Sequence, residues 1–169
     1  GATATQEGSL SSAHCVKSDG DITFSGGTAR LTVTGEAAKG FSAKGNITVS
    51  GGDITIENSG AGRLQGTDTY TAKGFTADKS VALLGGIIDI RMSGSGGKGV
   101  KADGEIVIGN KADASGPQLA VSTSGAQLGS SSSGMGGSFP GGGFPGGGGQ
   151  QQSGSSAKAN KAVGALYVY

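Results

Sequence analysis

The residues "AKGFSAKGNITVSGG" at 38–52 are the clearest indication of the fold, because closely related phrases follow them along the chain. They are "AKGFTADKSVALLGG" at 72–86 and "GKGVKADGEIVIG" at 97–109. Each phrase holds a lysine, an apolar residue, a small residue two positions later, a turn, and a run that alternates apolar and polar residues. Alternation with a period of two is typical of a β-strand. The recurrence therefore predicts a repeated β unit.

Aligning the phrases on their first apolar residue places other apolar residues in shared columns. The anchors, separated by 25, 34, 25 and 60 residues, are Val16, Phe41, Phe75, Val100 and Asn160. The other columns are Ile22, Ile47, Val81, Ile106, Leu166; Phe24, Val49, Leu83, Ile108, Val168; and Leu31, Ile56, Ile90, Val121. A unit of about 25 residues cannot bury its own apolar face, whereas stacked units can. We therefore predict an all-β fold, a parallel β-helix (solenoid) of about five coils, right-handed as parallel crossovers usually are.

The chain reads as a single domain over residues 1–169. Residues 1–10 are expected to form a partial first coil, and residues 61–71 a short insertion. A second insertion, 131–156, is rich in Gly, Ser and Pro, and this composition predicts a flexible loop. Glycine supplies 37 residues of the chain, and tight corners between strands account for much of that number without disorder.

Composition excludes several classes of function. The net charge of +1 offers no basic field for nucleic acid. No apolar stretch approaches 18 residues, so no membrane span is expected. There is one His and one Cys, and neither stands in an arrangement that suggests a catalytic triad. We therefore expect a protein that is not an enzyme.

Lysine occupies one position in successive units and forms a charged column. Its members, with His14 at the first unit, are Lys39, Lys73, Lys98 and Lys158, and a second, patchier column holds Lys17, Lys101 and Lys161. Like charges stacked at the coil spacing repel one another unless they are solvated or matched by anions. The columns therefore fit two interpretations. One is an anion-binding strip made by His14, Lys39, Lys73, Lys98, Lys158 and Lys101; the other is a solvated edge that discourages aggregation.

Carboxylates recur in the first turn of the units, at Asp19, Asp78 and Asp103, with Lys44 in the equivalent place of another unit. Two carboxylates one coil apart either share a proton or bind a cation. Ca²⁺ accepts such oxygens together with carbonyls from Gly-rich turns, so these aspartates are candidate calcium ligands. Lys44 and Lys79 lie nearby and could neutralise them instead.

The phrases "AKGFSAKGNITVSGGDITI" and "GKGVKADGEIVIG", with the insertion "GMGGSFPGGGFPGGGG", resemble a family of bacterial surface proteins called carbohydrate-binding domain-containing proteins. The resemblance covers roughly residues 11–125 and 157–169. It implies a right-handed parallel β-helix similar to that of pectate lyases. It also implies binding of plant cell-wall polysaccharides such as cellulose and polygalacturonate, with calcium bound and no established lyase activity. Lys44 and Val163 depart from the family pattern, which has Asp at both positions.

Two functions remain as expectations. The first is a non-catalytic, extracellular or cell-surface β-helix that binds an acidic or plant cell-wall polysaccharide along one face. The alternative is a structural subunit. Neither end of the sequence carries a polar segment that would cap a solenoid, so either the sequence is a piece of a longer solenoid or the chains stack end to end. Such a subunit would self-associate end to end through its open coils into an extracellular filament. A polysaccharide lyase ranks behind both.

Overall fold

The computed structural model describes residues 3–4, 10–11, 13–66, 68–128, 158–162 and 165–169. These residues form eighteen strands and no helix, so the prediction of an all-β protein is confirmed. Among them there is accordingly no helix long and apolar enough to cross a membrane.

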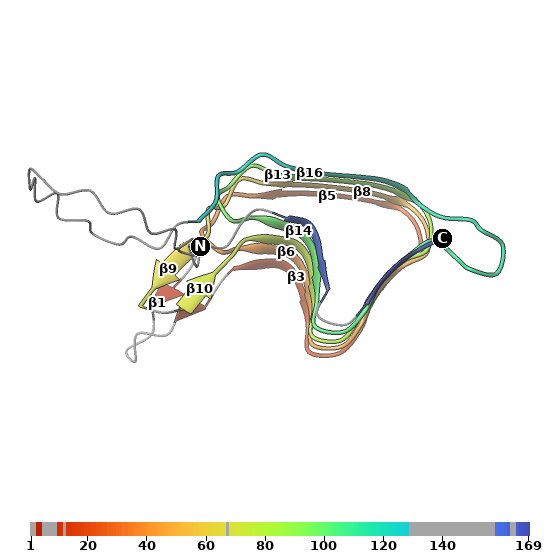
Figure 1. Cartoon of the computed structure of the whole chain (residues 1–169), viewed down its shortest axis with the longest axis horizontal. Helices are drawn as coiled ribbons and strands as arrows, with labels where there is room; N and C mark the ends of the chain where they lie inside the picture. The colour runs from red at the N-terminus through yellow and green to blue at the C-terminus, as the bar shows by residue number, and fades with distance from the viewer. Residues whose placement is uncertain (1–2, 5–9, 12, 67, 129–157, 163–164) are drawn as a thin grey trace, which may run out of the picture.

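Three parallel sheets carry most of the strands (Figure 1). The first sheet holds β3 (His14–Ser18), β6 (Lys39–Ala43), β11 (Lys73–Ala77), β14 (Lys98–Ala102) and β17 (Lys158–Ala162). The second holds β4 (Ile22–Phe24), β7 (Ile47–Val49), β12 (Val81–Leu83), β15 (Ile106–Ile108) and β18 (Leu166–Val168). The third holds β5 (Thr28–Val33), β8 (Asp53–Asn58), β13 (Ile87–Met92) and β16 (Gln118–Thr123).

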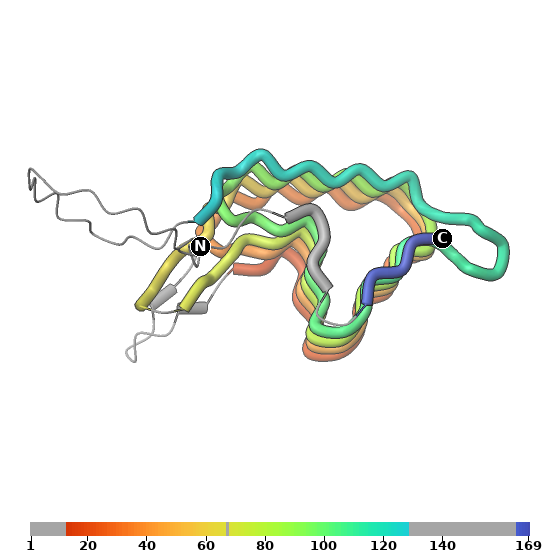
Figure 2. Tube along the Cα trace, in the orientation of Figure 1, coloured from red at the N-terminus to blue at the C-terminus, as the bar shows by residue number. Residues whose placement is uncertain are grey.

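The chain visits the first, second and third sheets in turn and then returns to the first. We call one such passage a circuit. Figure 2 shows the circuits lying one over another with nearly the same outline. Pairing between circuits places like residues side by side, as in the row from Val16 through Phe41 and Phe75 to Val100. The apolar columns predicted from the sequence are therefore the registers that the strands adopt.

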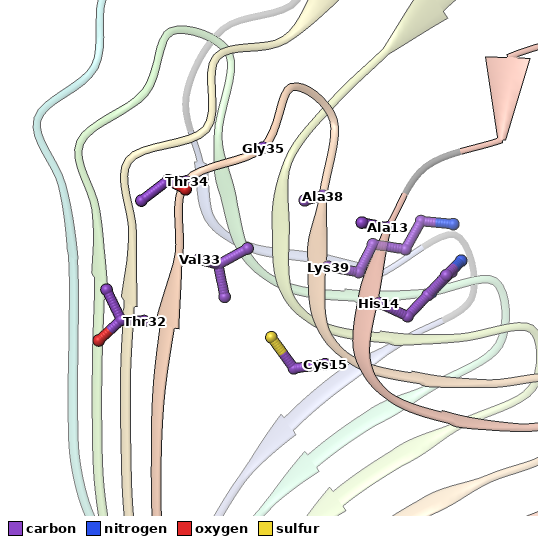
Figure 3. Close-up of a pocket in the computed structure, with 9 residues that line it drawn as sticks. All are labelled: Ala13, His14, Cys15, Thr32, Val33, Thr34, Gly35, Ala38 and Lys39. Atoms are coloured by element: carbon purple, nitrogen blue, oxygen red, sulfur yellow. The ribbon is translucent and has the colours of Figure 1, made fainter. Parts of the chain in front are cut away.

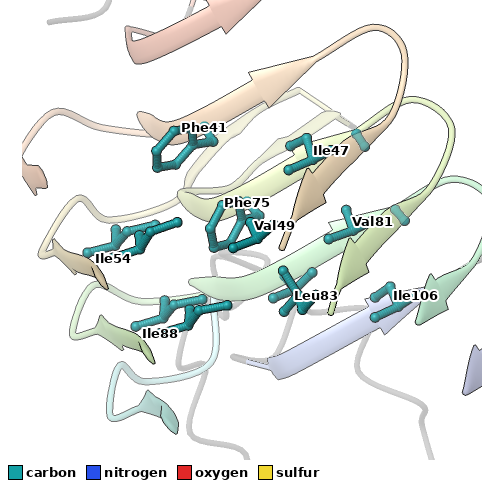
Figure 4. Close-up of a cluster of buried hydrophobic side chains, with 14 of the residues drawn as sticks. Phe41, Ile47, Val49, Ile54, Phe75, Val81, Leu83, Ile88 and Ile106 are labelled. Carbon is teal, nitrogen blue, oxygen red and sulfur yellow. The ribbon is translucent and has the colours of Figure 1, made fainter. Parts of the chain in front are cut away.

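The core lies between the three sheets and is filled by these columns (Figure 4). Phe75 is fully buried and stacks on Phe41, with ring centroids 5.1 Å apart and an interplanar angle of 17°. Ile, Val and Leu side chains from the second and third sheets complete the layer. Because a β-branched or aromatic side chain in one circuit meets its equivalent in the next, one favourable packing geometry is used repeatedly.

Two hairpins leave the circuits at the same corner, just before a strand of the first sheet. The pair β9 (Arg63–Gln65) and β10 (Asp68–Tyr70) precedes β11, and the pair β1 (Thr3–Ala4) and β2 (Leu10–Ser11) precedes β3. The insertion predicted over 61–71 is thus an antiparallel hairpin. The partial first coil predicted over 1–10 holds the antiparallel pair β1–β2 in its described part, and the insertion predicted over 131–156 lies outside the described residues.

Asn58 closes this corner at the circuit that carries the hairpin β9–β10. It is 1% exposed and occupies a column that holds Val33 and Met92 in neighbouring circuits. Its Nδ2 donates to the carbonyl oxygens of Ala38 (3.1 Å) and Lys73 (3.2 Å), while its Oδ1 accepts from the Gly60 amide (3.0 Å). A buried amide with these partners satisfies backbone groups that would otherwise lack hydrogen bonds.

The strands of the first sheet bend sharply in the middle, as Figure 1 shows for β3, β6 and β14. Successive residues Gly40 and Phe41 are both buried, which breaks the alternation of the strand. In the next circuit, a Cβ on Gly74 would lie 2.5 Å from the Gly99 carbonyl oxygen and 2.8 Å from Cγ2 of Ile90. Only glycine allows the strand to approach its neighbours this closely.

We predict that Gly74→Ala lowers the free energy of unfolding by roughly 1–3 kcal/mol, the range found for overpacked cores. Gly26→Ala is the matched control, because a Cβ at Gly26 meets no atom within 4 Å. Both substitutions stiffen the unfolded chain equally, so the difference between them isolates the close approach at the bend. Urea unfolding of the two variants measures it, and equal stability of the two would contradict this account.

Candidate functional site

The lysine column of the sequence is a row of adjacent residues in the first sheet. Pairing runs from His14 to Lys39, Lys73, Lys98 and, by backbone register, Lys158. The second column pairs Lys17, Ser42, Thr76, Lys101 and, again by backbone register, Lys161. Adjacent strands are about 4.8 Å apart, so the row places lysines of successive circuits next to one another.

The bend brings the two columns toward one another on the outer side of the sheet. Lys73 precedes the bend and Lys101 follows it one circuit further along, yet the charge of Lys101 lowers the pKa of Lys73. We use the name lysine face for the basic side chains of both columns that the structure describes, which are His14, Lys17, Lys39, Lys73, Lys98 and Lys101. Asp78 and Asp103 border it, since their charges act on Lys39 and Lys73.

The ammonium groups of the lysine face differ in their surroundings. Lys98 is 6% exposed, and its Nζ donates to the hydroxyl of Thr71 at 3.1 Å. Among the described residues, the ammonium groups of Lys39 and Lys73 have no hydrogen-bond or ion-pair partner, although both side chains are partly buried. Because burial without a partner penalises a charged group, these two cations are suited to receive an anion.

The pKa values of these groups are lowered by the same burial. Burial, followed by the charges of Lys39, Lys101 and Lys98, lowers the pKa of Lys73 from 10.5 to about 8, against an opposing effect of Asp103. Burial also lowers the pKa of Lys39, and Asp78 partly restores it. Desolvation, followed by the nearby lysines, lowers the pKa of His14, so its imidazole is held neutral at pH 7.

The aspartate column is engaged by lysines in two circuits. Lys44 Nζ lies 3.0 Å from Asp19 Oδ1. Lys101, in β14, forms an ion pair with Asp103 in the turn that follows the same strand. The hydrogen bond and charge of Lys44 hold the pKa of Asp19 below its usual value. Asp78 is exposed in the same column. Within the described part of the chain, no three His, Cys, Asp or Glu side chains gather as a metal site, and calcium at Asp19, Asp78 and Asp103 stays a prediction.

A pocket of about 180 Å³ opens beside the first residue of the lysine face (Figure 3). His14, Cys15 and Lys39 line it together with residues 32–35 of the third sheet's edge. Figure 3 shows His14 and Lys39 extending to one side of their strands while the sulfur of Cys15 points the other way, toward Val33. Nδ1 of His14 is buried without a hydrogen-bond partner among the described residues.

A second hollow, of about 440 Å³, lies on the outer face of the third sheet. Arg91 and Glu57 meet there across neighbouring circuits, with 3.4 Å between Arg91 Nη1 and Glu57 Oε1. Asp89 also binds Arg91, with 2.6 Å between Oδ2 and Nη2. Hydroxyls complete the wall, from Thr32, Ser59, Ser93, Ser122 and Ser124.

Sequence reasoning missed two residues that shape the lysine face. Thr71, the partner of Lys98, lies at the end of the inserted hairpin, where no column exists to reveal it. Asn58 holds the backbone of Lys73 from another sheet. The one available signal was a polar residue between the apolar Val33 and Met92 in its column.

Fold and site together define an all-β protein whose parallel sheets present a row of partly buried cations. A family model described as "Carbohydrate-binding domain-containing protein" matches residues 2–124. The match spans most of the chain, so the protein belongs to this family, and a role in binding carbohydrate follows at that general level. No curated protein and no solved structure matches the chain.

The lowered pKa of Lys73 predicts that stability depends on pH. Its folded-state pKa of about 8 lies below the unfolded value of 10.5, so unfolding takes up a proton between these limits. Stability therefore rises as the pH increases from about 8 toward 10.5, where the penalty of a buried charge disappears. Lys73→Met removes that penalty, and we expect this variant to exceed the wild type in stability at pH 7 and to lose the advantage by about pH 10.

Lys111→Met is the control, since Lys111 is an exposed lysine outside the lysine face. Urea unfolding at pH 7, 8.5 and 10 compares the two variants with the wild type. A stability difference between Lys73→Met and the wild type that stays constant across this range would contradict the assignment.

Proposed function

We propose that the protein is a non-catalytic carbohydrate-binding module that holds an acidic polysaccharide, such as a plant cell-wall uronate polymer, along its lysine face. The observation that carries the proposal is the row of partly buried, unpaired ammonium groups at Lys39 and Lys73 in a chain that belongs to a carbohydrate-binding family. In this proposal each circuit is one coil of a right-handed parallel β-helix, and the protein acts outside the cell or at its surface.

Charge spacing supports a polymer rather than a single sugar acid. Lys39, Lys73 and Lys98 follow one another at the strand spacing of about 4.8 Å, so their attraction for an anion extends along the stack. A chain with a carboxylate on each unit can meet several of these ammonium groups at once, which raises the effective concentration of each later contact. Carboxylates also relieve the mutual repulsion of the lysines, an advantage that a neutral glycan does not offer.

A binding role fits the chemistry of the lysine face better than catalysis does. His14 is neutral and borders a pocket, but the charges that act on it come from lysines, and no carboxylate is among them. Arg91, whose guanidinium could serve a lyase, is engaged by Glu57 and Asp89 on a different sheet. Release of unsaturated uronates, followed by ultraviolet absorbance, would overturn the non-catalytic part of the proposal.

Titration with polygalacturonate and with its fully methyl-esterified form tests the charge requirement. We expect the free acid to bind and the neutral ester to bind at least tenfold more weakly. The double variant Lys39→Met/Lys73→Met should lose at least tenfold in affinity for the acid, because each buried charge-assisted contact contributes about 1.5–3 kcal/mol. Lys111→Met should bind as the wild type does. Isothermal titration calorimetry at two salt concentrations measures these affinities.

Equal binding of acid and ester, or unchanged affinity in the double variant, would exclude the lysine face as the site. Repeating the titration after removal of divalent ions tests the calcium prediction separately. A loss of affinity that Ca²⁺ restores, and that Asp78→Asn/Asp103→Asn abolishes, would support calcium at these aspartates. Affinity that is indifferent to chelator would contradict it.

A structural role is a second candidate, favoured by the edge of β18. Leu166 is 51% exposed and Val168 is 66% exposed, although both belong to columns that are buried at Ile47, Val49 and Val81. A further strand paired to β18, from a second molecule, would cover them. Negative-stain electron microscopy at micromolar protein concentration tests this candidate: fibres of regular width favour end-to-end stacking, and separate short particles contradict it.

A further inference from the structure

Lys73 stands between two other lysines of the first sheet. Strand β11 pairs in register with β6 on one side and with β14 on the other, which places Lys39 and Lys98 next to Lys73. His14 follows Lys39 in the row, and the charge of Lys73 reaches it. The Lys73 side chain is half-buried, and its ammonium group has no hydrogen-bond or ion-pair partner among the described residues. A positive charge at Lys73 is therefore opposed from both sides of its strand.

The main chain holds Lys73 in this position. Its amide donates to the Ala38 carbonyl at 3.1 Å, and its carbonyl accepts from Nδ2 of the buried Asn58 at 3.2 Å. The next residue, Gly74, lies so close to the neighbouring strand that a Cβ there would meet the Gly99 carbonyl oxygen at 2.5 Å. Because the backbone is fixed in this way, the repulsion at Lys73 is relieved by loss of its proton or by an anion, and not by a shift of the strand.

The surroundings of Lys73 favour the uncharged amine near neutral pH. Burial, followed by the charges of Lys39, Lys101 and Lys98, lowers its pKa to about 8, whereas Asp103 opposes this effect. Asp103 is itself ion-paired with Lys101, which limits the support it gives to Lys73. Near pH 7.5 about a quarter of the Lys73 side chains are therefore uncharged, against roughly one in a thousand for an exposed lysine.

An uncharged amine between two cations is suited to react with carbon dioxide. The nitrogen lone pair attacks the carbon of CO2, the electrons of one C–O π bond move to oxygen, and the nitrogen loses one proton to solvent. The product is a carbamate, which carries a negative charge where the ammonium group carried a positive one. Repulsion from Lys39 and Lys98 then becomes attraction, and each can donate a charge-assisted hydrogen bond to the carbamate. An aldehyde would give an imine without this negative charge, so the row favours CO2.

We propose that Lys73 is a site of reversible modification by carbon dioxide, at which Lys39 and Lys98 stabilise the carbamate from the neighbouring strands. The modification itself does not depend on the function proposed above. One consequence does rest on that function: conversion of an ammonium group to a carbamate removes two units of positive charge from the lysine face. Abundant CO2 should therefore weaken the binding of an acidic polymer there.

Carbon NMR of the full chain with isotope-labelled bicarbonate near pH 7.5 tests the modification. The carboxyl carbon of a carbamate gives a signal distinct from those of bicarbonate and dissolved CO2. Triethyloxonium converts the carbamate to a stable ethyl ester, and peptide mass spectrometry then identifies the modified residue, which we expect to be Lys73. An α-amino group reacts in the same way, so only a signal that Lys73→Met removes counts.

Variants at Lys39 test the role of the neighbouring charge. Lys39→Met removes a cation that favours the uncharged amine and stabilises the carbamate, so the Lys73 carbamate should fall roughly threefold or more. Lys39→Arg keeps the charge and should stay within about twofold of the wild type. Lys111→Met, at an exposed lysine outside the lysine face, should have no effect. Thermal unfolding of each variant confirms that it folds. The absence of a signal that depends on Lys73, or an unchanged carbamate level in Lys39→Met, would overturn the proposal.

Titration with polygalacturonate tests the consequence for the lysine face separately. At constant pH and ionic strength, replacing chloride by bicarbonate should weaken binding to the wild type but not to Lys73→Met, which also controls for competition by bicarbonate itself. A Lys73 carbamate that leaves the polymer affinity unchanged would exclude its action on the lysine face. If the polymer binds under neither condition, the proposed function fails, while the NMR signal still decides whether Lys73 forms the carbamate.

Discussion

In-register parallel pairing between successive circuits determines which side chains meet in this structure. Each strand hydrogen-bonds to its equivalent in the neighbouring circuit, so residue types that recur in the sequence become neighbours in space. A shift of one residue would turn every side chain to the opposite face. The stack of Phe41 on Phe75 and the aliphatic columns around it stabilise one register over the others.

The same register imposes a cost wherever the recurring residue is charged. Lys39, Lys73 and Lys98 are brought together by the pairing that stacks the phenylalanines two residues later. The circuits differ in how they accommodate the repulsion between the lysines. Lys98 donates a hydrogen bond to Thr71, whereas the pKa of Lys73 is lowered. The anion binding proposed for this row would offset that cost.

The sequence alone predicted the strands and columns because repetition supplies its own alignment. The positions of His14, Lys39, Lys73 and Lys98 in one row followed from the spacing of the phrases. The bend in the first sheet could not be predicted in this way, because Gly40 and Gly74 resemble the other glycines of the sequence until their neighbours from the third sheet are known. The partners of the site were harder to predict, since Thr71 lies in an insertion outside the repeat, and the column of Asn58 shows that this residue is polar but not what it binds.

Departures from the repeat therefore mark where this fold acquires specificity. The hairpin β9–β10 enters at the corner before Lys73, and its last residues bring Thr71 to Lys98. Asn58 replaces an apolar residue in that circuit and binds the Lys73 carbonyl, which fixes the strand where the chain returns from the hairpin. The repeated positions build a stack that any such sequence could form, while the non-repeated ones give each face a distinct chemistry.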